Sequence, residues 1–199
     1  MIRHAVRALP WGVLAVGAVV LTGLLVLVQR WPWTLWPLEG GAVGLVSASA
    51  VWCFDEPLAA VVDTLPRGLA WRTAARSLGV VVLLVVWVGV VAWTRSGLFG
   101  HAPDVAWQGV AATVGAGALA TWRRSGGVGS PARPIAAALV AVCLFVALAR
   151  PFEEQLTVFP YGPGADWAGG RLLWTVVALA GVALLASRGT AYLHRSGGG

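Results

Sequence analysis

The chain has 199 residues, of which 58% are hydrophobic and 11% are charged, whereas soluble domains carry about 25% charged and about 45–50% apolar residues. This composition excludes a water-soluble globular domain and indicates a membrane protein. The 14 basic residues are all arginine, so the chain lacks the lysine of a P-loop and of a Schiff base. ATPase and pyridoxal chemistry are therefore excluded, and the net charge of +6 is expected to reflect membrane topology rather than nucleic-acid binding.

Six apolar stretches follow one another along the chain. A helix rises about 1.5 Å per residue and the hydrocarbon core is about 30 Å thick, so about 20 apolar residues span it. The stretches are continuous and lack the two-residue alternation of barrel strands. We expect an all-α, polytopic membrane protein with one transmembrane domain over residues 1–199 and six transmembrane helices, at about 9–28, 35–54, 77–94, 105–122, 134–149 and 172–187.

The arginines divide unevenly between alternate connections, ten against four. The larger set is Arg3, Arg7, Arg67, Arg72, Arg76, Arg123, Arg124, Arg133, Arg188 and Arg195, and the smaller set is Arg30, Arg95, Arg150 and Arg171. The positive-inside rule places the larger set and both termini in the cytoplasm, which predicts a multi-pass protein of the plasma membrane. Glu39 and Asp104 are expected on the outer side, and no ionisable residue is expected in the middle of a span.

Eleven of the 12 tryptophans lie near predicted span boundaries, and Trp87 alone lies well inside a span. This distribution is typical of an aromatic belt at the headgroup level. For the segment WPWTLW at 31–36, the alternative is an aromatic cage for a cationic ligand. Cys53 and Cys143 are expected at depths too different for a disulfide. The three histidines are scattered, and neither a metal nor a cofactor is expected.

The connection between the second and third spans begins at Asp55 and reads DEPLAAVVDTLPRGLAWRTAAR. Pro57, after two carboxylates, favours a helix start, and Pro66 favours its end. Between them, apolar residues recur at helical spacing: Leu58, Val61, Val62 and Leu65. The pattern predicts a short amphipathic helix at about 57–65 on the cytoplasmic surface. Acids lead its polar side, whereas lysine and arginine bind anionic lipid, so a protein partner is favoured over a helix that merely lies on headgroups.

Through the phrase FDEPLAAVVDTLPRGLAWRTAAR, the chain resembles the small six-span permease subunits of actinobacterial ATP-binding-cassette (ABC) transporters. In exporters of the type V architecture, a similarly placed connection contains a coupling helix that docks into the ATPase subunit. The resemblance implies an ABC ATPase partner that hydrolyses the ATP, a second permease subunit in a homo- or heterodimer, and no enzymatic activity in this chain. It assigns the ATPase contact to Asp55, Glu56, Pro57, Val61, Asp63, Thr64 and Arg67.

Few polar side chains are available inside the spans. The residues expected to line a substrate pathway are Ser47, Ser49, Thr113, Cys143 and Phe145, with Gln108 as a further polar group. Serine and threonine often return their hydroxyl to their own helix, which is the structural alternative. The fourth span, rich in alanine and glycine, is expected to pack closely against other helices. Without a buried acid, histidine or arginine, an ion-driven carrier would lack its relay, so the energy is expected from the ATPase.

The connection at 151–170 faces outside and is too apolar for a free loop, so we expect it to dip into the interface or cover a cavity. We expect a permease subunit that moves a hydrophobic or amphiphilic substrate, with export as the expected direction, and that contacts membrane lipids but no nucleic acid. The alternative is a substrate-binding membrane subunit of an energy-coupling-factor vitamin importer, which docks through small residues of its first span, here Gly12, Ala15, Gly17 and Ala18. A membrane scaffold without a transport role is a third class.

Overall fold

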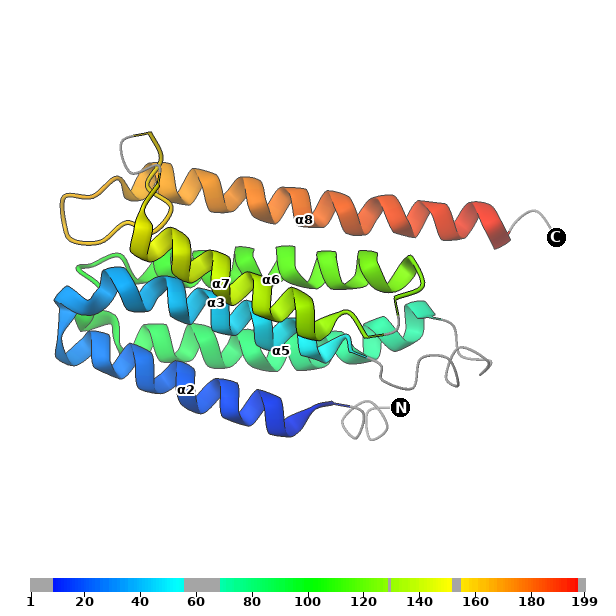
Figure 1. Cartoon of the computed structure of the whole chain (residues 1–199), viewed down its shortest axis with the longest axis horizontal. Helices are drawn as coiled ribbons and strands as arrows, with labels where there is room; N and C mark the ends of the chain where they lie inside the picture. The colour runs from blue at the N-terminus through cyan, green and yellow to red at the C-terminus, as the bar shows by residue number, and fades with distance from the viewer. Residues whose placement is uncertain (1–8, 56–68, 129, 152–154, 197–199) are drawn as a thin grey trace.

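The computed structural model describes residues 9–55, 69–128, 130–151 and 155–196. These residues form six long α-helices packed side by side in one bundle (Figure 1), which confirms the all-α expectation. The helices are α2 (Trp11–Arg30), α3 (Leu35–Cys53), α5 (Leu69–Trp93), α6 (Ala102–Ser125), α7 (Ala132–Ala149) and α8 (Trp167–Ser196). Two short 3₁₀ turns, η1 (Pro32–Thr34) and η2 (Arg95–Gly97), follow α2 and α5.

Four of the described helices have the length and composition of membrane spans: α2, α7, the Thr73–Trp93 part of α5 and the Trp167–Ser187 part of α8. Large apolar side chains are exposed along them, among them Val19, Val85 and Leu172. Such a continuous apolar exterior is suited to lipid and unsuited to water. The chain is therefore a multi-pass membrane protein.

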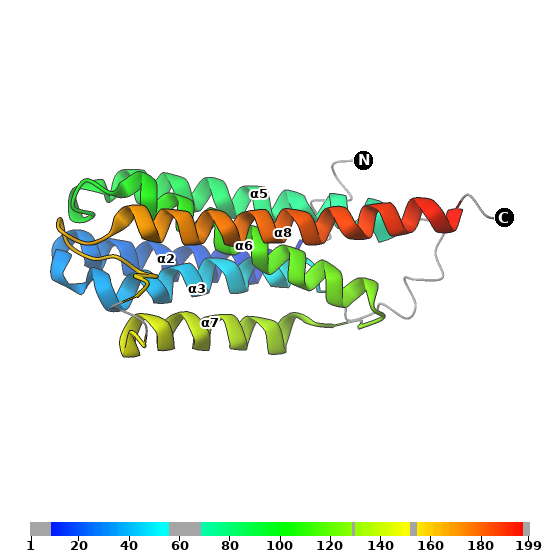
Figure 2. The ribbon, with the colours of Figure 1, turned by 90° about the horizontal axis from the view of Figure 1, so that it is seen from above.

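The other two helices, α3 and α6, form the centre of the bundle. Helix α7 packs on α3, α8 packs on α6, and α2 and α5 cover the remaining sides (Figures 1 and 2). Thirteen of the 19 residues of α3 are buried. Because neighbouring helices shield this pair from lipid, α3 and α6 tolerate small and polar residues that an exposed span does not.

Glycines bring the helices of this bundle into close contact. A methyl group at Gly40 or Gly44 of α3 would meet Cys143 of α7, so this glycine pair sets the distance between the two helices. A methyl at Gly181 of α8 would meet the backbone of Gly115 in α6. The expected close packing of the fourth span is thus seen at Gly115, and α3 adds a second close pair with the small-xxx-small spacing of membrane helix contacts.

The helices alternate in direction, so α2 begins and α8 ends at the same end of the bundle (Figure 1). We name this the arginine-rich end, because its helical turns carry Arg72, Arg76, Arg123, Arg124, Arg133, Arg188 and Arg195. The opposite, arginine-poor end carries Arg30, Arg95, Arg150 and Arg171. Arg3, Arg7 and Arg67 lie outside the described residues.

The helices extend beyond the apolar stretches that predict them. Helix α5 begins at Leu69 rather than at 77, α6 at Ala102 rather than at 105, and α8 continues to Ser196 rather than 187. Hydropathy identifies only the part of a helix that lies in the hydrocarbon core of the membrane. The helical backbone continues beyond that part, through turns that contain arginine. The helix ends therefore reach past the apolar core at both ends of the bundle.

The connection before α8 folds over the arginine-poor end. Its backbone accepts hydrogen bonds from two tryptophans: Trp174 Nε1 donates to the Val158 carbonyl at 3.0 Å and Trp167 Nε1 to that of Gly162 at 2.9 Å. The Phe159 ring packs 5.6 Å from that of Trp174. A cavity of about 20 Å³ lies between this segment and the end of α7, which is room for one water molecule. The expected covering role is therefore seen at 155–166.

Candidate functional site

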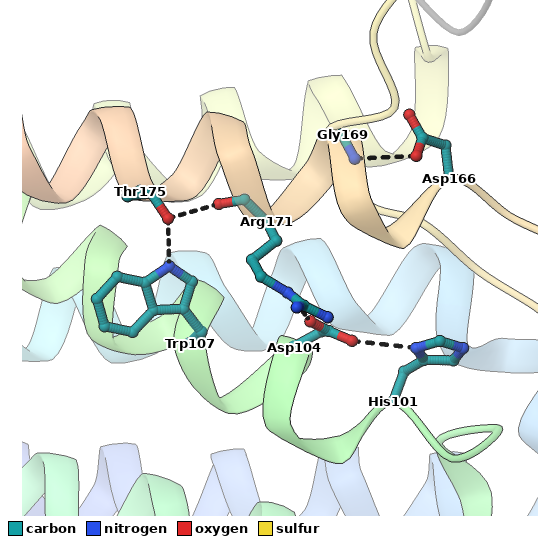
Figure 3. Close-up of polar contacts among 7 residues, drawn as sticks. All are labelled: His101, Asp104, Trp107, Asp166, Gly169, Arg171 and Thr175. Carbon is teal, nitrogen blue, oxygen red and sulfur yellow. Dashed lines mark hydrogen bonds and ion pairs between the residues drawn. The ribbon is translucent and has the colours of Figure 1, made fainter.

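Polar side chains join the beginnings of α6 and α8 at the arginine-poor end (Figure 3). Asp104, in the first turn of α6, accepts a hydrogen bond from Arg171 Nε of α8 at 2.7 Å on its Oδ1 atom. Its other oxygen lies 3.0 Å from His101 Nδ1. Asp104 is buried, whereas the Arg171 side chain is 61% exposed. The three side chains form an ion-pair cluster that we name the outer clamp.

Asp104 precedes the apolar stretch of α6, and its partners determine its ionisation. Burial alone would raise the pKa of Asp104, but hydrogen bonds from Arg171 and His101, together with their charges, outweigh burial and hold that pKa below its usual value. The His101 ring stacks on that of Trp167 at 4.2 Å and almost parallel, at 2°. Asp104 is therefore held as a carboxylate with its donors in place.

The hydroxyl near the outer clamp is already used in contacts within and between helices. Thr175, the hydroxyl drawn in Figure 3, accepts from Trp107 Nε1 at 3.1 Å and donates to the Arg171 carbonyl at 2.8 Å. Nearby, the Asp166 carboxylate accepts from the Gly169 backbone N–H at 2.9 Å at the start of α8. Within the described ranges, no three histidine, cysteine, aspartate or glutamate side chains gather as metal ligands. The arrangement is suited to joining helices.

A second group of polar side chains is buried between the two central helices. Glu39, in the second turn of α3, is 1% exposed, and Gln108 of α6 is 2% exposed. Neither carboxyl oxygen of Glu39 has a hydrogen-bond partner, and neither has Oε1 of Gln108. The Gln108 side chain lies beside the Glu39 carboxyl group, which also interacts with the positive charge of Arg150 at the end of α7. We name Glu39 and Gln108 the buried pair.

The burial of Glu39 contradicts the expectation that the chain has no buried acid. The expectation is wrong although the predicted span also begins at 35: a carboxylate this near the start of a span is expected at the surface, whereas Glu39, one turn inside α3, is buried. Gly40 then lets α7 and Phe159 approach closely and cover this part of α3. The chain thus has a buried ionisable group, and an ion-driven carrier is not excluded for lack of one.

The five residues expected along a substrate pathway do not all come together. Ser47, Ser49, Thr113 and Cys143 are buried in the bundle, whereas Phe145 is 60% exposed on the outside of α7. The Ser47 hydroxyl donates to the Val43 carbonyl of its own helix at 2.7 Å, which is the structural alternative for this residue. The Thr113 hydroxyl has no partner. Cys53 and Cys143 are both free, as expected.

Asp55 is the one predicted ATPase-contact residue that the structure describes. Its carboxylate accepts hydrogen bonds from the Ser130 hydroxyl, at 2.8 Å to Oδ1, and from the Ala132 backbone N–H at 3.3 Å. Ala132 is the first residue of α7, so Asp55 caps that helix from the end of α3. Arg76 of α5 donates to the carbonyl oxygens of Cys53 and Asp55. We name these contacts the Asp55 latch.

The remaining residues of the predicted contact lie outside the described residues, as does the expected surface helix at 57–65. They are Glu56, Pro57, Val61, Asp63, Thr64 and Arg67. The carboxylate of Asp55 already accepts hydrogen bonds from other residues of this chain. A contact between the 56–68 segment and another protein would therefore depend on the other six residues. Sequence reasoning missed Ser130 and Arg76, because a serine in a glycine-rich connection and an arginine before a span carry no signal of their partner.

The surroundings of Trp36 disfavour the alternative of an aromatic cage for a cationic ligand at 31–36. Trp31 and Trp33 are exposed, and Trp87 is fully buried with its Nε1 donating to the Ala106 carbonyl at 2.9 Å. The guanidinium of Arg150 lies 5.3 Å from the ring centre of Trp36, and 3.9 Å from that of Tyr161. An arginine of the chain itself thus occupies the face of Trp36 that a cationic ligand would use.

Comparison with known proteins adds no family to this geometry. No family model, no curated protein and no solved structure matches the chain. The functional conclusions below therefore rest on the bundle, the buried pair and the Asp55 latch.

Proposed function

We propose that this chain is the transmembrane permease subunit of an ABC transporter that moves a hydrophobic or amphiphilic substrate across the plasma membrane. In this proposal all six helices cross the membrane, and the arginine-rich end, with both termini, faces the cytoplasm. A separate ATPase subunit binds to the 56–68 segment from the cytoplasmic side, and a second permease subunit completes the transporter. Export remains the proposed direction.

The observation that carries the proposal is the Asp55 latch. Asp55 directly precedes the 56–68 segment in the chain and lies two residues after the end of α3; it caps α7 and accepts a hydrogen bond from Arg76 of α5 on its carbonyl. A displacement of this segment would therefore act on three helices together. This is what a coupling element requires, because an ATPase can do work on a substrate site only through a connection that moves the helices.

The central helices give further support. A purely structural anchor has no need of polar groups in its interior, since each costs free energy unless it is paired. Here Glu39, Gln108 and Thr113 all carry unpartnered polar atoms in the core. Such groups favour a protein whose central helices change partners during a transport cycle over an inert scaffold.

The proposal is tested on the full chain purified in mild detergent from membranes of its native host. A double variant, Glu56→Lys with Asp63→Lys, reverses the charge of the predicted contact. We expect vanadate-sensitive ATP hydrolysis to co-purify with the wild-type chain and to fall at least about tenfold in the variant, because like charges replace a complementary pair at an interface. The measurement is phosphate release per purified chain.

Ser130→Ala is the matched control, because it weakens the Asp55 latch without touching the 56–68 segment. We expect this variant to retain the co-purified ATPase and to lose only the coupling of hydrolysis to transport. Wild-type chain that co-purifies no ATP hydrolysis contradicts the proposal, and so does a charge-reversed variant that retains all of it.

One observation favours the importer subunit as a second candidate. Gly12 and Ala15 lie on an exposed face of α2, and nothing lies within 4 Å of a methyl placed at Gly12. This face is open to a partner helix, although Gly17 packs inward on Ser49 and is not available. An importer subunit binds its small-molecule substrate tightly when purified alone, whereas the permease alone does not, and equilibrium dialysis with labelled vitamins separates the two.

A further inference from the structure

The buried pair leaves acceptor atoms of both side chains without a hydrogen-bond partner in the closed bundle. Both carboxyl oxygens of Glu39 and the Oε1 atom of Gln108 are buried without a partner. A buried acceptor left unpaired costs roughly 1–3 kcal/mol, and an unpaired carboxylate costs more. A protonated carboxyl group avoids this cost, because it carries no charge and supplies a donor of its own.

The donor that fits is a proton on the carboxyl group. A protonated Glu39 has an O–H that donates to Gln108 Oε1, and this one bond satisfies an atom of each central helix. Glu39 and Gln108 are 1% and 2% exposed, so bulk water does not reach the carboxyl group in the closed bundle. A cavity beside Ala147 and Phe159 measures about 20 Å³, which is room for one water molecule.

We propose that Glu39 and Gln108 form an internal proton-binding site, which exchanges its proton with water when α3 and α6 separate. In the closed bundle, Glu39 carries the proton and shares it with Gln108. On opening, the Glu39 O–H bond breaks, the proton passes to a water molecule to give hydronium, and the carboxylate keeps the bonding pair. This property goes beyond the proposed permease function and does not depend on the ATPase.

The position of the pair indicates the side on which the proton is exchanged. Glu39 lies in the second turn of α3, counted from the arginine-poor end. Arg150 lines the small cavity at that end, and its positive charge reaches Glu39. A carboxylate formed on opening is stabilised by this charge, so exchange with water is expected through the arginine-poor end.

Infrared spectroscopy of the full chain in lipid nanodiscs at neutral pH tests the site. A protonated carboxyl absorbs at a C=O stretching frequency separate from that of carboxylates, so wild type minus Glu39→Gln should show one such band. Gln108→Leu should move the band to higher frequency, because the hydrogen bond to Oε1 is lost. In heavy water the band should shift to lower frequency, because the proton exchanges.

Glu39→Gln keeps the size of the side chain and supplies an N–H donor to Gln108, so this variant is expected to fold. Asp166→Asn is the matched control, since its carboxylate caps α8 at the surface, and the band should be unchanged. Absence of the band in wild type overturns the proposal. A band that remains unshifted after overnight incubation in heavy water also overturns it, because the proton is then locked in the structure. Neither result bears on the co-purified ATPase.

Discussion

Three carboxylates, Asp55, Asp104 and Glu39, have the same chemistry in three different surroundings. Asp104 contacts a guanidinium and an imidazole, and Asp55 accepts from a hydroxyl and a backbone N–H. Glu39 accepts from no donor. A carboxylate in a medium of low dielectric constant is stable only when donors surround it. The first two side chains therefore hold helices together, whereas the third depends on a proton of its own.

At this scale we predict the effect of Asp104→Asn. The variant loses a charge-assisted hydrogen bond worth about 1.5–3 kcal/mol, so the melting temperature in detergent should fall by about 3–10 °C at neutral pH. The folded-state pKa of Asp104 lies below its unfolded value, which is about 3.9. The stabilisation is therefore complete above the unfolded pKa and is lost as the pH falls through the folded-state pKa.

A double-mutant cycle with Arg171→Gln isolates the outer clamp. If the two side chains act as a pair, the double variant should lose less stability than the sum of the single variants. Strict additivity, or a difference between wild type and Asp104→Asn that persists in strong acid, contradicts this account of the clamp.

Helices α3 and α7 show what an element needs in order to pack in a membrane. Lipid is as apolar as the helices, so close backbone approach, rather than escape from water, brings them together. We predict that Gly40→Ala separates the pair, because the added methyl meets the Ala147 side chain and the Cys143 carbonyl. Overpacking of this kind costs about 1–3 kcal/mol, which corresponds to a fall of about 2–10 °C in melting temperature.

Gly89→Ala is the matched control for this prediction. Gly89 lies in the middle of α5 with nothing within 4 Å of an added methyl. Its replacement should leave the melting temperature unchanged or raise it, since alanine favours a helix over glycine by roughly 0.5–1 kcal/mol. Equal effects of the two substitutions would show that helix propensity, and not the α3–α7 contact, decides the outcome.

The helices that face lipid were the ones most readily predicted from the sequence. The apolar stretches of α2, α5, α7 and α8 identify spans directly, because composition records contact with hydrocarbon. The interior helices are harder to interpret. In the sequence, polar residues such as Glu39 and Gln108 look like breaks in an apolar span. They are buried because neighbouring helices cover them, and this covering is visible only in the structure. Helix ends also escape prediction, because arginine-bearing turns continue past the apolar core.

For the whole molecule, the alternation of helices divides the arginines between the two ends, and this division predicts the orientation. Single cysteines are introduced at Val128 and at Gly164, both exposed and at opposite ends of the bundle, after Cys53 and Cys143 are replaced by serine. A membrane-impermeant maleimide should label Gly164→Cys in intact cells and Val128→Cys only after permeabilisation. Labelling of both from one side contradicts the six-crossing topology.

At this scale the division of the arginines between the two ends of the bundle could be predicted from the sequence, but the candidate sites could not. Arginine counts depend on chain order alone, so they are accessible without coordinates. The Asp55 latch joins residues 75 positions apart, and the outer clamp joins residues 67 apart. No local sequence pattern around Asp55 or Asp104 predicts which residues they contact. Contacts between helices depend on the orientation of each helix about its axis and on the angles at which the helices cross. A short stretch of sequence does not reveal either.

The enclosure of α3 and α6 by the other helices has a consequence for synthesis. The translocon partitions each segment into lipid by its own hydrophobicity, and these two segments are less apolar than the four recognised as spans. Each emerges from the ribosome directly after an apolar neighbour, α3 after α2 and α6 after α5. The folded bundle keeps both neighbours in contact. Each of the two less apolar helices is therefore synthesised directly after a helix that it contacts in the folded bundle.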